Sequence, residues 1–137
     1  TKLFTFSDSK LEEAKRTGRV KTLGGYPLVC PKSKGRTEPT KPFSYWCQGS
    51  VGEIISRAMV SIDRETDVPM VMTVHDELVF EIPFDYCRPE DWEDVGYLVK
   101  GYMEQAALSF GIQVPVTVSL HLTSWNKDDA EIKGEFY

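Results

Sequence analysis

The sequence lacks two features of exported and membrane proteins. It has no apolar run near the roughly 18 residues that a spanning helix needs, and no signal-like start. Cysteine is scarce as well: Cys30, Cys47 and Cys87 are an odd number without metal-site spacing, which predicts reduced thiols. Hydrophobic residues make up 41% of the 137 residues, so disorder is not expected. These absences predict a single soluble domain that is not exported and lies in the cytoplasm.

Charge is unevenly divided along the chain. Residues 1–57 contain 11 Lys and Arg against 5 Asp and Glu, whereas residues 58–137 contain 5 against 16. A basic half can meet a polyanion, and an acidic half can concentrate metal ligands. The alternative is that both halves are ordinary solvated surfaces.

The stretch from Met70 to Ile82 places its charged residues between two apolar runs. Met70-Val71-Met72 and Leu78-Val79-Phe80 are rich in strand formers, and His75, Asp76 and Glu77 lie between them. This pattern predicts a β-hairpin with the charged residues at its tip. Adjacent carboxylates repel each other, and a bound divalent cation relieves that repulsion. The alternative is a solvated polar turn without a ligand.

A family resemblance enters at this stretch. Residues Val74 to Glu81, Val-His-Asp-Glu-Leu-Val-Phe-Glu, resemble motif C of family A DNA polymerases, which include bacterial DNA polymerase I and many phage replicases. Upstream, Gln48 to Ser50 and the helix after them are similar to the Gln-Gly-Ser/Thr helix of that family. Gly18 to Gly25 and Ser124-Trp125 resemble two further segments, so the likeness covers almost the whole chain in the right order.

The resemblance implies an α+β fold and a division of roles. The fold would be an antiparallel palm-type sheet whose central hairpin packs on two long helices, the C-terminal palm segment spanning residues 1–137. Asp76 would bind catalytic Mg²⁺, with Glu77 as a weaker or indirect ligand. The residues implied in primer-template binding are His75, Gln48, Arg57, Lys21 and Arg19. Gln48 could donate to minor-groove acceptors that all base pairs share.

One residue and one short segment depart from the family pattern. Ser44 stands where the family commonly has Asn, which puts one DNA contact in doubt. Val51-Gly52-Glu53 stands where the family has Ala-Ala-Asp, and Glu53 keeps the charge.

In the first half of the chain, four local elements are predicted. Capping-box spacing of Ser9 and Glu12 and a possible stop at Gly18 predict a helix from Ser7 to Thr17. Arg19 to Val29 predicts a hairpin with a two-residue turn at Gly24-Gly25. Residues 31–42 predict a basic loop, either a DNA contact or a mobile surface segment. Phe43, Tyr45 and Trp46 could stack on bases, but core packing is the commoner role.

The second half adds helices and a strand. Helical spacing of apolar residues predicts a helix from Ser50 to Arg64 and another from Pro89 to Gly111. The stripe expected to be buried on the second helix is Trp92, Val95, Leu98, Val99, Tyr102, Met103 and Ala106. Alternation predicts a half-buried strand from Val114 to Leu122 with His121 facing solvent, and residues 126–137 predict a loosely held charged tail.

Catalysis in the family needs two elements whose patterns do not occur in this sequence. One is a palm strand with a second metal-binding Asp, and the other is a fingers helix that binds the incoming dNTP. We therefore expect part of a DNA-directed DNA polymerase, from a longer chain or a split enzyme, that is inactive without the remaining polymerase portion. The host would be a bacterial or phage-infected cell. The rivals are a polymerase-derived DNA-binding or assembly module without catalysis, and a small Mg²⁺-dependent nuclease.

Overall fold

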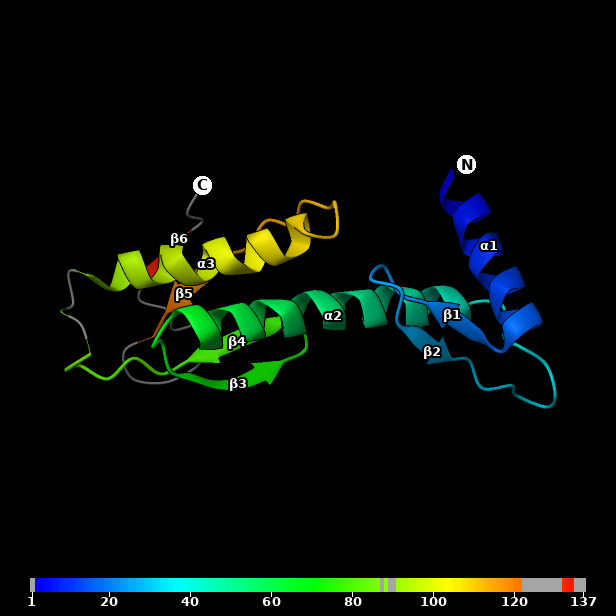
Figure 1. Ribbon diagram of the computed structural model, residues 1–137, viewed down its shortest axis with the longest axis horizontal. Helices are drawn as coiled ribbons and strands as arrows, with labels where there is room; N and C mark the ends of the chain where they lie inside the picture. The colour runs from blue at the N-terminus through cyan, green and yellow to red at the C-terminus, as the bar shows by residue number, and fades with distance from the viewer. Residues whose placement is uncertain (1, 87, 89–90, 122–131, 135–137) are drawn as a thin grey trace. The chain divides into compact units, whose positions relative to one another are not determined.

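The computed structural model (Figure 1) describes residues 2–86, 88, 91–121 and 132–134. The chain divides into two compact units, residues 1–53 and residues 54–137. The predicted α+β class is confirmed: among these described residues, helices accompany three antiparallel sheets of two strands each. Within the described ranges, no helix is long and apolar enough to cross a bilayer.

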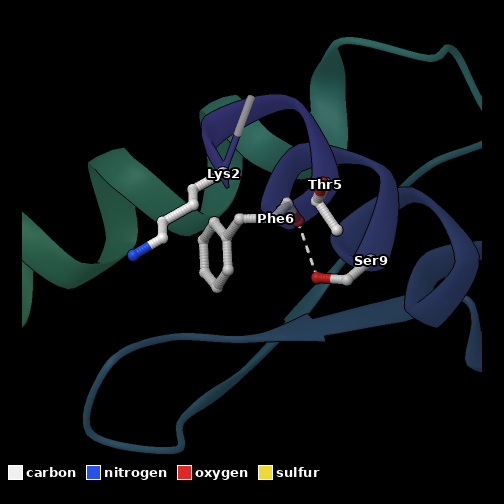
Figure 2. A pocket seen from close by; sticks show the side chains of 4 residues that line it. All are labelled: Lys2, Thr5, Phe6 and Ser9. Atoms are coloured by element: carbon white, nitrogen blue, oxygen red, sulfur yellow. Dashed lines mark hydrogen bonds between the residues drawn. The ribbon is translucent and has the colours of Figure 1, made fainter.

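The first unit opens with helix α1, Lys2–Thr17. It ends as predicted, because Gly18 adopts a positive φ of 71° and its N–H donates to Ala14 O at 2.8 Å. The start differs from the prediction. Ser9 lies inside the helix, where its hydroxyl donates to Phe6 O at 2.6 Å (Figure 2), so the predicted capping box is wrong.

Strands β1, Arg19–Lys21, and β2, Pro27–Val29, form the predicted hairpin, with Val20 opposite Leu28. The turn is longer than predicted. Thr22 N donates to Tyr26 O at 2.9 Å, which leaves Leu23, Gly24 and Gly25 between the paired residues. Only Gly25 of the two glycines has a positive φ, 90°. The connection is therefore a three-residue turn with glycine at the left-handed position.

Helix α2, Lys41–Glu65, begins at Lys41 rather than at Ser50. The predicted loop therefore ends before Lys41, and Gln48 lies within the helix. The aromatic residues explain the longer helix. Trp46 packs on the buried cluster of Ala14, Val20 and Cys30, together with Leu28 and Tyr45. This tertiary packing outweighs the modest helix propensity of aromatic residues and confirms the core role of Tyr45 and Trp46.

In the second unit, β3, Met70–Val74, and β4, Glu77–Phe80, form the hairpin expected from the sequence. Its inner side packs on α2 and on α3, Trp92–Leu108. Leu78 contacts one buried cluster of Ile54, Ala58, Ala106 and Ala107 and a second of Ile62, Val68 and Val99. The predicted packing of the hairpin on two helices is confirmed.

Details of α3 differ from the prediction. Leu98, placed in the buried stripe, is 44% exposed. Its neighbour Val99, which belongs to the same predicted stripe, is buried as predicted. The predicted start at Pro89 lies outside the described residues. The helix ends at Leu108, and Gly111 adopts a φ of 77° just beyond it.

The last sheet is shorter than predicted. Strand β5 covers Val118–Leu120 and pairs with β6, Ile132–Gly134. Val114 is 44% exposed and lies outside the strand, and Leu122 is outside the described residues. His121 is half-buried rather than solvent-facing, with Nε2 3.3 Å from Ser119 Oγ. The loosely held tail is wrong for residues 132–134, since they pair with β5.

Candidate functional site

The tip of the β3–β4 hairpin brings three predicted site residues together. Val74 pairs with Glu77, so His75 and Asp76 alone form the turn. His75 has a positive φ of 56°, a conformation that costs an L-residue roughly 1–2 kcal/mol. Such strain persists where the surrounding structure over-determines it, often at functional sites. His75 and Asp76 are exposed and Glu77 is half-buried.

The chemistry of this tip suits a hard cation. Asp76 and Glu77 supply carboxylate oxygens, the donors that Mg²⁺ prefers. Magnesium sites commonly use one or two carboxylates and complete the shell with water and substrate phosphates. In the part of the chain that the structure describes, no group of three His, Cys, Asp or Glu side chains forms a metal cluster. The tip therefore fits an open Mg²⁺ site built from two carboxylates, not a closed cage.

The hairpin beneath the tip is anchored by apolar packing. Leu78 follows Glu77 directly and contacts both buried clusters of its unit, and Phe80 packs on the second. A register shift lies at the far end of the hairpin, between Met70 and Met72, away from the turn. The packing of Leu78 and Phe80 thus anchors the backbone next to the charged tip.

Arg57, predicted to bind DNA, lies on α2 within the second unit. Its Nη1 donates to Ser109 Oγ at 2.8 Å, and its Cζ lies 4.4 Å from the centroid of the Phe110 ring. These contacts fix the guanidinium against the end of α3. Arg57 is exposed, and a guanidinium has five N–H donors, so donors remain for a phosphate.

The other predicted DNA-binding residues lie in the first unit. Arg19 and Lys21 are exposed on β1, one on each side of the buried Val20. Because alternate residues of a strand share a face, the two cations lie on the same outer face. Gln48 is exposed on α2. The structure thus groups Arg19 with Lys21 and, separately, groups His75 with Asp76 and Glu77.

The role of Gly49 was not recognised from the sequence. A Cβ at Gly49 would overlap Leu28 Cδ1 and lie 2.9 Å from Thr22 Cγ2. Only glycine lets α2 approach the β1–β2 hairpin this closely. Gly49 of the Gln-Gly-Ser segment is therefore a packing residue.

Ser50 and Glu53 hold the same hairpin through its turn. Ser50 Oγ is buried, accepts from Leu23 N at 2.9 Å and donates to Trp46 O at 2.7 Å. Glu53 Oε2 accepts from Gly24 N at 3.0 Å. We call Gly49, Ser50 and Glu53 the helix clamp. The two family-like segments, one around Gly24 and the other around Gln48, thus pack as one structural element.

A separate surface depression lies along α1, lined by Lys2, Thr5, Phe6 and Ser9 (Figure 2). It contains none of the predicted site residues. The Phe6 ring stands 4.8 Å from that of Trp46, and Lys10 Nζ lies 5.4 Å from the Phe6 centroid. The Phe6–Trp46 contact joins α1 to α2, whereas the Lys10–Phe6 contact lies within α1.

Comparisons with known proteins identify relatives of this chain. DNA polymerase I of Synechocystis sp. is 39% identical over 77 residues, which are 54% of this chain and 7% of that protein. The thermostable DNA polymerase I of Thermus thermophilus is 31% identical over 130 residues, 88% of this chain and 15% of that protein. The chain therefore spans less than one sixth of the length of these relatives.

A solved structure shares the fold. The POL domain of Pol1 from M. smegmatis, in complex with DNA primer-template and dNTP, matches 74% of this chain and 19% of its own, with a TM-score of 0.61 at 22% identity. Residues 1–127 match the sequence profile of DNA polymerase family A. The chain therefore belongs to DNA polymerase family A.

Proposed function

We propose that the chain supplies one side of the nucleotidyl-transfer site of a DNA-directed DNA polymerase. The observation that carries this proposal is the hairpin tip, where a two-residue turn exposes Asp76 beside Glu77 on a packed base. Membership of family A supports the reaction class. The reaction would be attack of a primer 3′-hydroxyl on the α-phosphate of a dNTP.

In this proposal the two carboxylates have unequal roles. Asp76, exposed in the turn, binds Mg²⁺ directly, and Glu77, half-buried at the start of β4, orients or tunes the site. Bound Mg²⁺ ions would activate the nucleophile and neutralise charge on the leaving pyrophosphate. The chain's own contribution is to place the Asp76 carboxylate at the turn of a hairpin that is packed on two helices.

Primer-template contacts are assigned to the residues already located. His75 lies next to Asp76 and can donate to a phosphate or a base near the primer end. The exposed amide of Gln48 can donate to minor-groove acceptors. Arg19, Lys21 and the remaining donors of Arg57 would contact phosphates.

The site would be completed by another part of the polymerase. Within the described residues, β3 and β4 pair only with each other. An isolated two-stranded hairpin is marginally stable in water, and a sheet edge is a ready site for a further strand. We propose that a strand bearing the second metal-binding Asp pairs at this hairpin, in the same polypeptide or in a partner. On this proposal the enzyme works in the cytoplasm of a bacterial or phage-infected cell.

The test combines this chain with the remaining polymerase portion and compares the effects of substituting Asp76 and Glu77 on primer extension. Asp76→Asn should abolish nearly all primer extension, because an amide cannot replace an anionic Mg²⁺ ligand. Glu77→Gln should be milder, since indirect contacts to a metal site typically contribute about 10–100-fold. Circular dichroism should show both variants folded. If the Asp76→Asn enzyme kept most of its rate, Asp76 would not be the metal ligand.

The same assay distinguishes the rival functions. A nuclease would cleave DNA with Mg²⁺ and no dNTP, and Asp76→Asn would stop that cleavage. A binding or assembly module would bind primer-template but would never extend it, even with the remaining polymerase portion, Mg²⁺ and dNTP present. Either result would overturn the proposed polymerase role.

A further inference from the structure

Between β2 and α2 the chain forms a small, well-defined turn that the predicted polymerase site does not use. Ser33 pairs with Arg36 as an isolated antiparallel bridge. Ser33 N donates to Arg36 O at 2.9 Å, and Arg36 N donates to Ser33 O at 3.0 Å. Figure 1 shows the connection running from β2 to the start of α2. We call residues 32–36 the basic turn.

Both central residues of the basic turn have positive φ. Lys34 has a φ of 50° and Gly35 a φ of 77°, the sign pattern of a type I′ turn. Glycine or asparagine usually occupies the first of these positions. Lysine there costs roughly 1–2 kcal/mol, and the reciprocal hydrogen bonds of Ser33 and Arg36 hold it in place. The hydrogen-bonded turn thus places a long cationic side chain at its tip despite this cost.

The charge on the basic turn is not neutralised locally. Lys32, Lys34 and Arg36 are exposed, and no described carboxylate lies within ion-pair distance of them. The nearest acid in the sequence, Glu38, pairs with Lys41 at 3.2 Å. Elsewhere in this unit, Lys10 and Lys15 pair with Glu13 and Glu12. The basic turn is thus a short segment with three cations and no acid.

We infer that the basic turn is a phosphate-binding element that grips the backbone of duplex DNA. This inference extends the proposed function, because it assumes that the chain meets DNA. Closely spaced cations match a duplex, which carries one negative charge per roughly 1.7 Å of its axis. A turn ordered by its own hydrogen bonds loses little backbone freedom on binding. Contacts from Lys and Arg to phosphate oxygens carry no sequence information, so this contact would be independent of sequence.

The test compares two variants with the same charge change. The first is Lys32→Gln, Lys34→Gln and Arg36→Gln; the control is Lys2→Gln, Lys15→Gln and Arg16→Gln, which removes three exposed cations from α1. Fluorescence anisotropy would measure binding of each full chain to a labelled duplex over a range of salt, without Mg²⁺ or dNTP. Each lost phosphate contact lowers the log–log salt slope by about 1.

We expect the basic-turn variant to lose about two to three units of salt slope and the control less than about one. Equal losses in both variants would show that only net charge matters and would overturn the inference. So would tighter binding of the wild-type chain to anionic lipid vesicles than to the duplex. Gly35→Ala keeps every charge but disfavours positive φ, and it should also weaken binding. Unchanged affinity there would show that the ordered turn is not required.

The binding assay and the catalytic assay fail independently. Asp76→Asn should leave the salt slope unchanged, because the duplex is bound without metal. A basic turn that binds DNA in a chain with no polymerase role would keep this inference and end the proposed function. Primer extension that depends on Asp76, together with DNA binding that does not depend on the basic turn, would keep the proposed function and end this inference.

Discussion

Gly49 has no Cβ, and this lets α2 pack closely on the β1–β2 hairpin. The side chains of Leu28 and Thr22 occupy the space where a Cβ would project. Gly52, one turn further along α2, has nothing within 4 Å of the same position. Close packing therefore requires the absence of a Cβ at Gly49 but not at Gly52.

These two glycines give a matched pair of predictions. Gly49→Ala should destabilise the chain by about 1–3 kcal/mol, because overpacking pushes the hairpin from the helix. Gly52→Ala should be neutral or stabilise by about 0.5–1 kcal/mol, since alanine favours the helix and meets no neighbour. Urea unfolding measures both.

A local readout checks the cause. The amides of Leu23 and Gly24 are bonded to Ser50 and Glu53, so their hydrogen exchange should speed up in the Gly49→Ala variant alone. Faster exchange in both variants, or in neither, would contradict the packing argument.

At the scale of elements, Glu13 joins α1 to β1. Its Oε2 accepts from Lys10 Nζ at 3.0 Å, and its Oε1 accepts from Lys21 N at 2.9 Å. Burial by itself would raise the pKa of Glu13, but the hydrogen bonds from Lys10 and Lys21 outweigh it and hold the pKa below the ordinary value of 4.5. The carboxylate is thus bound better in the folded state than its acid form.

The sign of this shift predicts a pH dependence. A lowered folded pKa adds stability that is present above pH 4.5 and is lost as pH falls through the folded value. Glu13→Gln should cost about 1 kcal/mol at neutral pH, by analogy with a partly exposed charged hydrogen bond. The difference from wild type should shrink below pH 4.5.

Glu12→Gln is the matched control. Glu12 is an exposed neighbour whose carboxylate accepts from Lys15 Nζ at 2.7 Å, and such surface pairs contribute little. Urea unfolding at neutral and acidic pH should therefore show almost no change for it. A Glu13→Gln cost that stayed constant with pH would show that the charge of Glu13 is not involved.

At the scale of the whole molecule, the proposed site is one-sided. The hairpin presents Asp76 and Glu77, whereas a two-metal transfer needs ligands on both sides of the ion pair. No Lys, Arg and Tyr pattern of a fingers helix, which would orient a triphosphate, occurs in this sequence. Positioning of the substrate supplies much of the barrier reduction in such reactions.

We therefore predict that the 137-residue chain alone does not extend a primer. Primer extension with Mg²⁺ and dNTP should appear only when the remaining polymerase portion is present, fused or added. The isolated chain should still bind DNA weakly, with affinity that falls as salt rises. Robust extension by the chain alone would show that the additional ligands are not needed.

Local sequence determined much of this protein. Apolar flanks around His75-Asp76-Glu77 were enough to predict the hairpin, and one-sided spacing predicted α3 and the C-terminal part of α2. These features follow from the preferences and periodicity of neighbouring residues, which the sequence displays directly. The motif around Asp76 also indicated the family, which the comparisons confirm.

Tertiary structure decided what depends on residues far apart in the chain. Helix α2 begins at Lys41, earlier than predicted, because Trp46 packs on the cluster of Ala14, Val20 and Cys30. This packing outweighs the low helix propensity of the aromatic residues. The helix clamp meets the turn around Gly24 across more than twenty residues, and no local pattern encodes that meeting. Arg57 likewise reaches Ser109 only through folding. Such contacts are set by the free energy of the packed chain, not by the preferences of each segment.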